Sequence, residues 1–253
     1  MLTERIIQRL QNRKRFQNIC HANKLRLNYS ENRRAIPVLE EVFTERAYAL
    51  YFPFYQKSTI VDIGAHYGFF SIFASINSHP ASSVYAYEPF PANFAQLNKN
   101  IHQCEIHNVK TYPYAISNTS GRTTLYSGMS VNNSLIRDFR LLNQKSSRTF
   151  EIQSKTLEAI IHENTLEHID FLKMDCEGSE YGIFESTPKE IFDSIATLSM
   201  EFHDVKSEEY HAFYLISELK KHGFDIVHHS YNRSNMGLNF GKLVGTKLFR
   251  RTK

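Results

Sequence analysis

The chain of 253 residues contains no tryptophan, only three cysteines and no long apolar run. Cys20, Cys104 and Cys176 lie far apart and form no Cys-x-x-Cys pair, which argues against a disulfide framework and a cysteine zinc site. Crossing a bilayer takes about 20 apolar residues, and the first residues, Met1–Arg5, lead into a mixed-charge segment rather than a signal peptide. We therefore expect a reduced, cytoplasmic protein without a transmembrane segment.

A strong excess of one charge is also missing, because the net charge is only +4. Residues 1–57 carry +6 and residues 242–253 carry +5, which leaves −7 for the residues between them. The basic ends can make weak contact with an anionic surface, although solubilising ends are the simpler explanation. The charges lack the interleaved aromatic residues of a single-strand nucleic-acid groove, so we expect no nucleic-acid partner.

The hydrophobic content of 42% is that of a globular protein, and we divide the chain into an N-terminal helical extension, 1–57, and one domain, 58–253. In the extension, apolar spacing predicts a helix within residues 1–24 and another from Leu39 to Leu50 with Pro37 near its start. The polar segment around Asn28–Arg34 is predicted to connect these two helices. The aromatic run Tyr51–Tyr55 can form core or one wall of a substrate pocket, and core is the favoured interpretation.

From Ser58 onward, strands alternate with helices, which is typical of a mostly parallel sheet covered on both faces. The first strand ends in a glycine turn, and most later strands end in polar residues. The final pair is predicted to be antiparallel around an Asn/Gly-rich connection. The predicted strands are Thr59–Ile63, Ser83–Glu88, Val109–Ile116, Thr123–Tyr126, one within Ile152–Ile161, Asp170–Asp175, Ile195–Phe202, Phe224–His229 and Leu243–Phe249; the main predicted helices are Gly68–Asn77, Tyr181–Phe184 and Ser207–His222.

The first predicted strand runs into a turn with two glycines, Gly64 and Gly68, and then into an apolar helix. In such a unit the glycines let the backbone approach a ligand, and the helix N-terminus offers free N–H groups. Glu88 ends the next strand, where an acid can accept both ribose hydroxyls of a nucleoside. An ordinary tight turn between a strand and a helix would explain the two glycines, but it would not explain Glu88 at the end of the next strand.

This spacing alone does not separate S-adenosylmethionine from NAD. A dinucleotide turn needs Gly-x-Gly-x-x-Gly, and here His66 occupies the place of the middle glycine. Asp62 adds a carboxylate beside the site, which disfavours a pyrophosphate and favours a cationic ligand. The turn therefore favours S-adenosylmethionine, and NAD stays as the alternative.

A second motif follows the strand that ends at Asp175, where Asp175, Glu177 and Glu180 place three carboxylates within six residues. Ligands of open α/β sheets bind at these strand ends. Glu177 and Glu180 could simply favour a helix N-terminus, but Asp175 ends an apolar strand and points to a site.

Transfer of a methyl group to a hydroxyl needs a general base, and Asp175 and His203 are the best candidates, with Glu177 beside them. Asp175 with Glu201, His203 and Asp204 can also bind a divalent cation. Nothing in the spacing requires a metal, so we assign no metal ligand.

Several segments together resemble one known family. They are Val61–Ser71, Tyr87-Glu88-Pro89, Ala115–Asn118, Ser154–Glu158 and Ile169–Glu180. The chain resembles the FkbM family of methyltransferases over about residues 58–204, most specifically in the acidic motif. The resemblance implies an α/β, Rossmann-like class I methyltransferase fold with a mostly parallel seven-stranded sheet, helices on both faces and S-adenosyl-L-methionine as cofactor.

The resemblance also implies site roles. The turn, with Asp62, Gly64, Ala65, His66, Tyr67 and Gly68, would hold the methionine portion, Glu88 with Pro89 the ribose, and Ala115 and Ile116 the adenine. The family commonly has asparagine in the place of His66. An imidazole can still donate to the cofactor's carboxylate, but its charge would make binding pH-sensitive near neutrality.

The resulting hypothesis is an O-methyltransferase acting on a hydroxyl of a small molecule or glycan, such as a sugar, polysaccharide or polyketide. One rival is an NAD-binding oxidoreductase. The other is a non-catalytic methyltransferase-fold module that binds a partner. The Ser127–Ser134 loop and the N-terminal helices are expected to shape the acceptor pocket.

Overall fold

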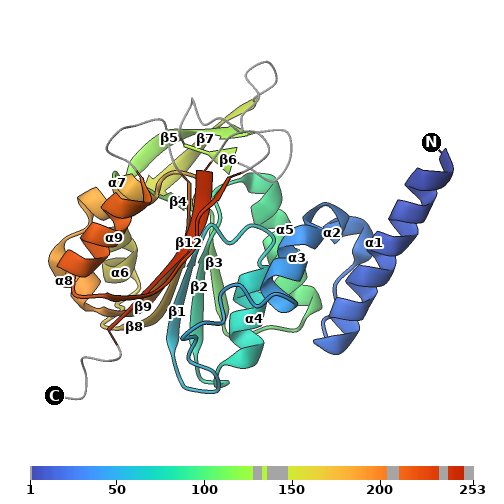
Figure 1. Ribbon diagram of the computed structural model, residues 1–253, viewed down its shortest axis with the longest axis horizontal. Helices are drawn as coiled ribbons and strands as arrows, with labels where there is room; N and C mark the ends of the chain where they lie inside the picture. The colour runs from blue at the N-terminus through green and yellow to red at the C-terminus, as the bar shows by residue number, and fades with distance from the viewer. Residues whose placement is uncertain (1, 128–132, 136–147, 204–210, 234–238, 248–253) are drawn as a thin grey trace.

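The computed structural model describes residues 2–127, 133–135, 148–203, 211–233 and 239–247. Its main sheet has five parallel strands, followed by an antiparallel pair at one edge (Figure 1). The predicted seven-stranded, mostly parallel sheet is confirmed, and a two-residue strand, β11 (Asn232–Arg233), adds to β12. In spatial order the seven strands are β10 (Asp225–His229), β12 (Asn239–Thr246), β9 (Ile195–His203), β8 (Ile169–Met174), β1 (Thr59–Ile63), β2 (Ser83–Tyr87) and β3 (Val109–Tyr112).

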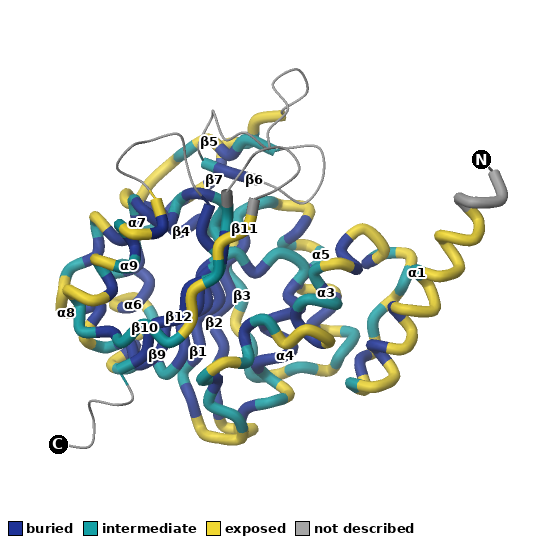
Figure 2. Tube along the Cα trace, in the orientation of Figure 1, coloured by how far each residue is buried: buried dark blue, intermediate teal, exposed yellow. Residues whose placement is uncertain are grey.

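Helices cover both faces of this sheet (Figure 1). Successive strand side chains alternate, so Val61 and Ile63 enter one core while Ile60 enters the other. Figure 2 shows the sheet as a buried layer between the two sets of helices. One set is α3 (Ile36–Phe43), α4 (Phe69–Asn77) and α5 (Pro91–Gln103), and the other is α6 (Leu157–Glu163), α7 (Glu180–Ser186), α8 (Lys189–Asp193) and α9 (Ala212–Lys221).

The N-terminal segment contributes to the core on the α3–α5 side. Phe16 of α1 (Leu2–Ala22) belongs to the same buried cluster as Phe52 and Phe70. Phe52 packs edge-to-face on Phe171 at 5.3 Å between ring centroids, which confirms the core interpretation for this ring. Tyr55, by contrast, is 75% exposed.

Two details of the N-terminal prediction are wrong. The second helix was expected to reach Leu50 but ends at Phe43, since Arg46 takes a left-handed φ of 54° that no helix accommodates. The polar connection is itself helical: Asn28 caps the short helix α2 (Tyr29–Asn32) by accepting from the Ser30 N–H, and a 3₁₀ turn, Arg33–Ala35, follows.

The expected strand Val109–Ile116 is also wrong as a single element. Pro113 has no N–H to continue the ladder, and the chain leaves the main sheet there. The residues after it form β4, which pairs in a second, four-stranded sheet above the carboxyl ends of the main strands (Figure 1). In spatial order its strands are β4 (Tyr114–Ile116), β7 (Arg148–Lys155), β5 (Gly121–Ser127) and β6 (Asn133–Ser134).

The C-terminal helix and antiparallel pair are present, but their bounds differ from those predicted: α9 begins at Ala212, and β12 begins at Asn239, four residues before the predicted Leu243. Helix α9 ends at Lys221, and Gly223, with φ 83°, closes it. Strands β10 and β12 pair antiparallel. The predicted positions 207–210 and 248–249 lie outside the described residues. Among the described helices, none is both long and apolar enough to cross a membrane.

Candidate active site

A cavity of about 350 Å³ lies at the carboxyl ends of the parallel strands, between the main sheet and the second sheet. Its volume falls within the roughly 300–1,000 Å³ of small-molecule sites. It sits where the strand order reverses between β1 and β8, the place where open α/β sheets bind ligands. The predicted site residues that line it are Gly64, His66, Glu88, Pro89, Ala115, Ile116, Asp175, Glu177 and His203. The lining does not include Asp62, Ala65, Tyr67 or Gly68.

The two glycines of the first turn are required by packing. Gly64 and Gly68 take φ values of 74° and 79°, which L side chains rarely adopt. A Cβ on Gly64 would lie 1.8 Å from the Asp175 carbonyl oxygen, and one on Gly68 would lie 2.4 Å from Leu97 Cδ1. The turn therefore lies directly against the strand end that bears the acidic motif.

His66 lies between these glycines with a left-handed φ of 52°. Its backbone N–H donates to Glu88 Oε2 at 2.8 Å, and its ring stacks on Tyr67 with 4.3 Å between centroids. Burial and the nearby Lys173 charge lower the pKa of the imidazole to about 4. The ring is therefore neutral near pH 7, so the expected charge change near neutrality is wrong. Its buried Nδ1 has no hydrogen-bond partner among the described residues.

Glu88 is only 4% exposed, and its orientation is fixed by the protein. Oε1 accepts from the Phe90 N–H at 2.9 Å and from Asn93 Nδ2 at 3.3 Å, while Oε2 accepts from His66 N. Burial raises the pKa of Glu88 to about 7, against the opposing effect of these hydrogen bonds. A carboxylate has about four lone-pair positions, so one, on Oε2, stays open to a ligand hydroxyl.

Asp62 has a different place from the one the sequence suggested. It is fully buried below the turn, where it accepts from Ser71 Oγ at 2.6 Å and pairs with Lys173 Nζ at 3.2 Å. Lys173 Nζ also donates to the Gly64 carbonyl at 2.8 Å. Asp62 therefore supports the turn from below and adds no carboxylate to the cavity rim.

Lys173 was missed by the sequence analysis, although a signal was present: it is a lysine inside the apolar strand Ile169–Met174. Its side chain is 4% exposed, and its Nζ lies 3.9 Å from Asp175 Oδ2. The cations of Lys173 and Lys242 lie 5.6 and 4.9 Å from the ring centroid of the buried Tyr48. This buried lysine connects the turn with the acidic strand end.

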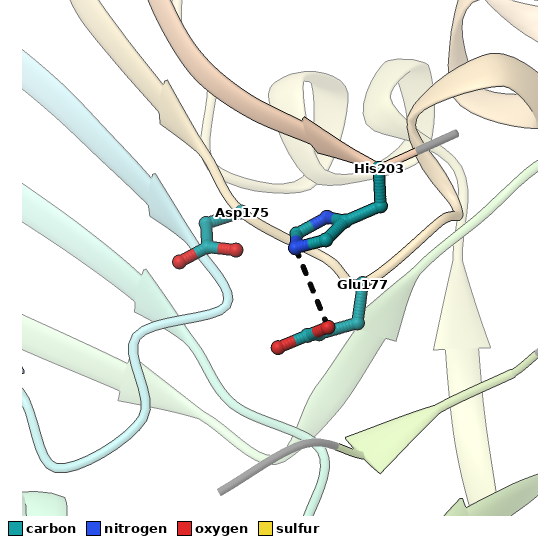
Figure 3. Close-up of side chains that lie close together, drawn as sticks. All are labelled: Asp175, Glu177 and His203. Carbon is teal, nitrogen blue, oxygen red and sulfur yellow. Dashed lines mark ion pairs between the residues drawn. The ribbon is translucent and has the colours of Figure 1, made fainter. Parts of the chain in front are cut away.

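The ends of β8 and β9 bring the predicted catalytic residues together. One ligand-type atom from each of Asp175, Glu177 and His203 lies within 4.8 Å of the others, and Figure 3 shows the three side chains converging. His203 Nε2 lies 3.5 Å from Glu177 Oε2 and 3.5 Å from Glu201 Oε1. Its Nδ1 lies 3.6 Å from Glu180 Oε1. The imidazole thus faces three carboxylates.

These surroundings decide the protonation of the cluster. Burial alone would lower the pKa of His203, but Glu177, Glu180 and Glu201 raise it well above its ordinary value. Burial raises the pKa of Glu177 to about 7 and that of Asp175 well above its usual range. The carboxylates therefore favour a protonated His203 near neutrality, and its role as general base stays a prediction.

The N-terminal helices and the second sheet also reach the cavity. Val38 and Glu41 of α3 line it, and Glu41 forms an ion pair with Lys242 of β12. Leu135 lines the opposite side, and Ser134 Oγ donates to the Glu177 carbonyl at 2.7 Å. Positions 128–132 of the expected pocket loop, and Asp204, lie outside the described residues.

Acidic side chains dominate the lining, in which the protonated imidazole of His203 is the cationic group. The acidic members of the lining among the described residues are Glu41, Glu88, Asp175, Glu177 and Glu201, and none of these lining residues is a lysine or an arginine. Such a wall favours a cationic ligand and disfavours a phosphate. Together with the strand order, it defines a Rossmann-like protein with a nucleoside site that suits a sulfonium cofactor.

The chain belongs to the FkbM methyltransferase family, since residues 62–226 match the model of the methyltransferase FkbM domain. Its cofactor is S-adenosylmethionine. It is 26% identical over 185 residues to Methyltransferase 1 of Beauveria bassiana, covering 67% of this chain and 74% of that protein. It is also 26% identical over 213 residues to 31-O-demethyl-FK506 methyltransferase FkbM of Streptomyces tacrolimicus, covering 74% and 80%. A third relative is Methyltransferase sdnD of Sordaria araneosa, with 22% identity over 65% and 73%.

Proposed function

We propose that this methyltransferase acts on a hydroxyl group of a neutral small molecule or glycan. The observation that carries the proposal is the cluster of Asp175, Glu177 and His203, which faces the same cavity as the cofactor turn. An alcohol keeps its proton at neutral pH and must lose it during transfer, so a proton acceptor beside the cluster fits a hydroxyl better than an amine. Glu201 offers one, because the hydrogen bond and charge of His203 lower its pKa against the effect of burial. One relative is named for the substrate 31-O-demethyl-FK506, which supports transfer to oxygen.

The fit of the cofactor rests on the turn and on Glu88. The open lone pair of Glu88 Oε2 accepts a ribose hydroxyl. His66 Nδ1, which has no hydrogen-bond partner within the part of the chain that the structure describes, lies in the wall where the methionine portion would bind. Ala115 and Ile116, at the end of β4, offer an apolar surface to the adenine. The glycines keep the backbone of the turn free of side chains. Ala65, Tyr67 and Gly68 act through the shape of the turn, because they do not line the cavity.

In the proposed reaction the acceptor hydroxyl lies against the carboxylates at the ends of β8 and β9. The bound cofactor supplies the methyl group and leaves as neutral S-adenosylhomocysteine. The acceptor's O–H bond breaks, the proton passes to a carboxylate of the wall, an O–CH₃ bond forms and the S–CH₃ bond breaks. The protein contributes position and proton acceptance, which together supply most of the rate of such a displacement.

The acceptor class follows from the lining. Five acidic side chains, with no lysine or arginine among the described lining residues, repel a carboxylate or phosphate acceptor. The apolar side chains of Val38, Leu125 and Leu135 share the wall with these acids. A neutral molecule with hydroxyl groups on an apolar framework, such as a deoxy sugar or a polyketide, suits both.

The experiment measures transfer of labelled methyl from S-adenosylmethionine to a panel of neutral polyols, sugars and amines. Glu88→Ala should weaken S-adenosylhomocysteine binding by about 100-fold or more, because a buried hydrogen-bonding carboxylate is lost. Asp175→Ala should keep binding and lower turnover by about 10²–10⁴-fold. Glu167→Ala, at an exposed position, serves as the control. Methylation of amines alone, or full activity of Asp175→Ala, would contradict the proposal.

A further inference from the structure

The side chains at the ends of β8 and β9 hold more negative charge than the protein neutralises. We propose that Asp175, Glu177 and His203 bind a divalent transition-metal ion, Zn²⁺ or Mn²⁺, which in turn holds the acceptor hydroxyl. The role of the ion in catalysis rests on the proposed function, whereas the binding of the ion does not.

The three side chains are close enough to share one ion. Their nearest ligand-type atoms all lie within 4.8 Å of one another. Ligands at about 2.0–2.2 Å from a metal are separated by at most about 4.4 Å, so shifts of a few tenths of an ångström complete the site. All three side chains line the cavity, which leaves the remaining coordination positions open to a substrate oxygen.

An independent observation is the orientation of His203. Its Nδ1 faces Oε1 of Glu180 at 3.6 Å, and its Nε2 faces Glu177 and Glu201 (Figure 3 shows the pair with Glu177). Histidines that bind a metal usually direct the other ring nitrogen to a carboxylate, which fixes the tautomer and the ring plane. Glu180 is fully buried and does not line the cavity, so it can serve this purpose without touching substrate.

The hydrogen bonding of these carboxylates points the same way. Buried Oε2 atoms of both Glu177 and Glu180 have no hydrogen-bond partner among the described residues. Glu180 Oε1, in contrast, accepts from the Cys176 N–H at 3.1 Å. His203 Nε2 lies 3.5 Å from Glu177 Oε2, within ion-pair distance but without a hydrogen bond. A buried carboxylate oxygen without a hydrogen bond is costly, and a cation bound beside Glu177 removes that cost.

The charge balance gives the reason for a divalent ion. One imidazole faces the carboxylates of Glu177, Glu180 and Glu201, and Asp175 is a fourth. Lys173 lies closer to Asp62, at 3.2 Å, than to Asp175, at 3.9 Å. Lys242, which also acts on Glu201, pairs with Glu41. The half-buried and buried acids at these strand ends therefore outnumber the bases, and a divalent cation restores the balance.

The ligand types select the ion. A mixed set of one imidazole and two carboxylates suits Zn²⁺ or Mn²⁺ better than Mg²⁺ or Ca²⁺, which prefer oxygen alone. An acceptor hydroxyl bound to the ion loses its proton more easily. The O–H proton would pass to Glu201, whose Oε1 lies 3.5 Å from His203 Nε2. The O–CH₃ bond would form as the S–CH₃ bond of the cofactor breaks, with S-adenosylhomocysteine as the leaving group.

The test measures metal binding directly on the full chain after treatment with a chelator. Calorimetry with ZnCl₂ and MnCl₂, and the loss of the free Mn²⁺ paramagnetic resonance signal, should each show one ion per chain, with Mg²⁺ binding more weakly. Glu177→Gln and His203→Gln should each weaken Mn²⁺ binding by about 100-fold or more, and Glu180→Gln by about 10–100-fold. Glu151→Gln, whose side chain is 72% exposed, should bind as the wild type does.

S-adenosylhomocysteine binding by each variant shows whether the fold is retained. Absence of saturable Zn²⁺ and Mn²⁺ binding at millimolar metal, or equal binding in all variants, would overturn the metal site. Full hydroxyl methylation in excess chelator would also overturn it and leave the proposed function standing. Tight metal binding without methyl transfer to any hydroxyl would overturn the proposed function and leave the metal site standing.

Discussion

The two halves of the cavity are built in opposite ways. At the ends of β1 and β2, where we propose that the cofactor binds (the cofactor half), two backbone N–H groups and the Asn93 amide donate hydrogen bonds to Glu88. At the ends of β8 and β9, where we propose that methyl transfer takes place (the reactive half), Glu177, Glu180 and Glu201 crowd one imidazole. Two of these acids keep a buried oxygen without a hydrogen-bond partner among the described residues.

This difference separates two tasks. A site for a fixed cofactor benefits from groups that are oriented before binding, because little has to be ordered when the ligand arrives. A reacting centre needs charge that the protein itself does not satisfy, so that the ligand and the transition state can use it. The halves meet at the contact of Gly64 with Asp175 and at Lys173.

The largest expected effect comes from Lys173→Met, which removes the cation between the halves. Asp62 is fully buried, so losing its partner should lower the free energy of unfolding by about 3–5 kcal/mol. Urea unfolding measures this loss. The double variant with Asp62→Asn should recover a large part of it, because no buried charge is left unpaired.

Lys99→Met is the matched control for this prediction. Lys99 pairs with Glu31 at the surface, and its side chain is 52% exposed, so the unfolding midpoint should stay within error of the wild type. A Lys173→Met protein as stable as Lys99→Met would show that the two halves are not held together through this lysine.

A smaller effect is expected from Gly64→Ala. The new Cβ would lie 1.8 Å from the Asp175 carbonyl oxygen, and the strand ends would have to separate. Gly121→Ala, also at a positive φ but with no atom within 4 Å of its Cβ, isolates the backbone strain. We expect Gly64→Ala to cost about 2–3 kcal/mol more than Gly121→Ala in urea unfolding. Equal costs would mean that the contact between the halves is loose.

The smallest effect is a pH dependence confined to the cofactor half. We expect Glu88, with its pKa of about 7, to accept a ribose hydroxyl in its ionised form, so affinity for S-adenosylhomocysteine should rise about tenfold per pH unit below 7 and level off above it. His66, with a pKa of about 4, stays neutral over this range. Calorimetry from about pH 5 to about pH 9 tests this, and Glu88→Gln should bind weakly with a flat profile.

The neutral thioether of S-adenosylhomocysteine makes this experiment specific. It carries no sulfonium charge, so ionisation of the Asp175–Glu177 wall affects it less than it affects the methyl donor. A slope that survives in Glu88→Gln would place the titrating group in the reactive half instead.

Much of the fold could be predicted because its signals are local. The alternation of apolar strands and helices indicated the main sheet, and Gly223 indicated the end of α9. The second sheet was missed, because the pairing of β4 with β7 joins residues about forty positions apart in the sequence. Pro113 was the one local sign of the break, and it stood inside an otherwise continuous β-branched and aromatic run.

The positions of the site residues could be predicted from the sequence, but the direction and protonation state of their side chains could not. Strand ends bring Glu88, Asp175 and His203 to one edge of the sheet, and the sequence shows where the strands end. Whether a side chain points into the cavity or below it depends on which side of the strand it occupies. This direction was not evident from the sequence, so Asp62 was wrongly predicted to lie beside the ligand. The neutral state of His66 and the charged state of His203 depend on partners from other strands, so no local pattern carries them.

Pro113 has a consequence for how such a protein can diversify. Before it, the chain builds a scaffold whose buried strands tolerate few changes. The chain that follows, through β7, forms the second sheet, whose own core contains only Ala115, Leu125 and Ile152 as buried members among the described residues. Replacing side chains there alters the roof of the cavity while the donor site beneath keeps its shape. Under the proposed function, the side chains in β5 and directly after β6 that line the cavity can therefore change while the glycine turn and Glu88, on an earlier stretch of the chain, are retained.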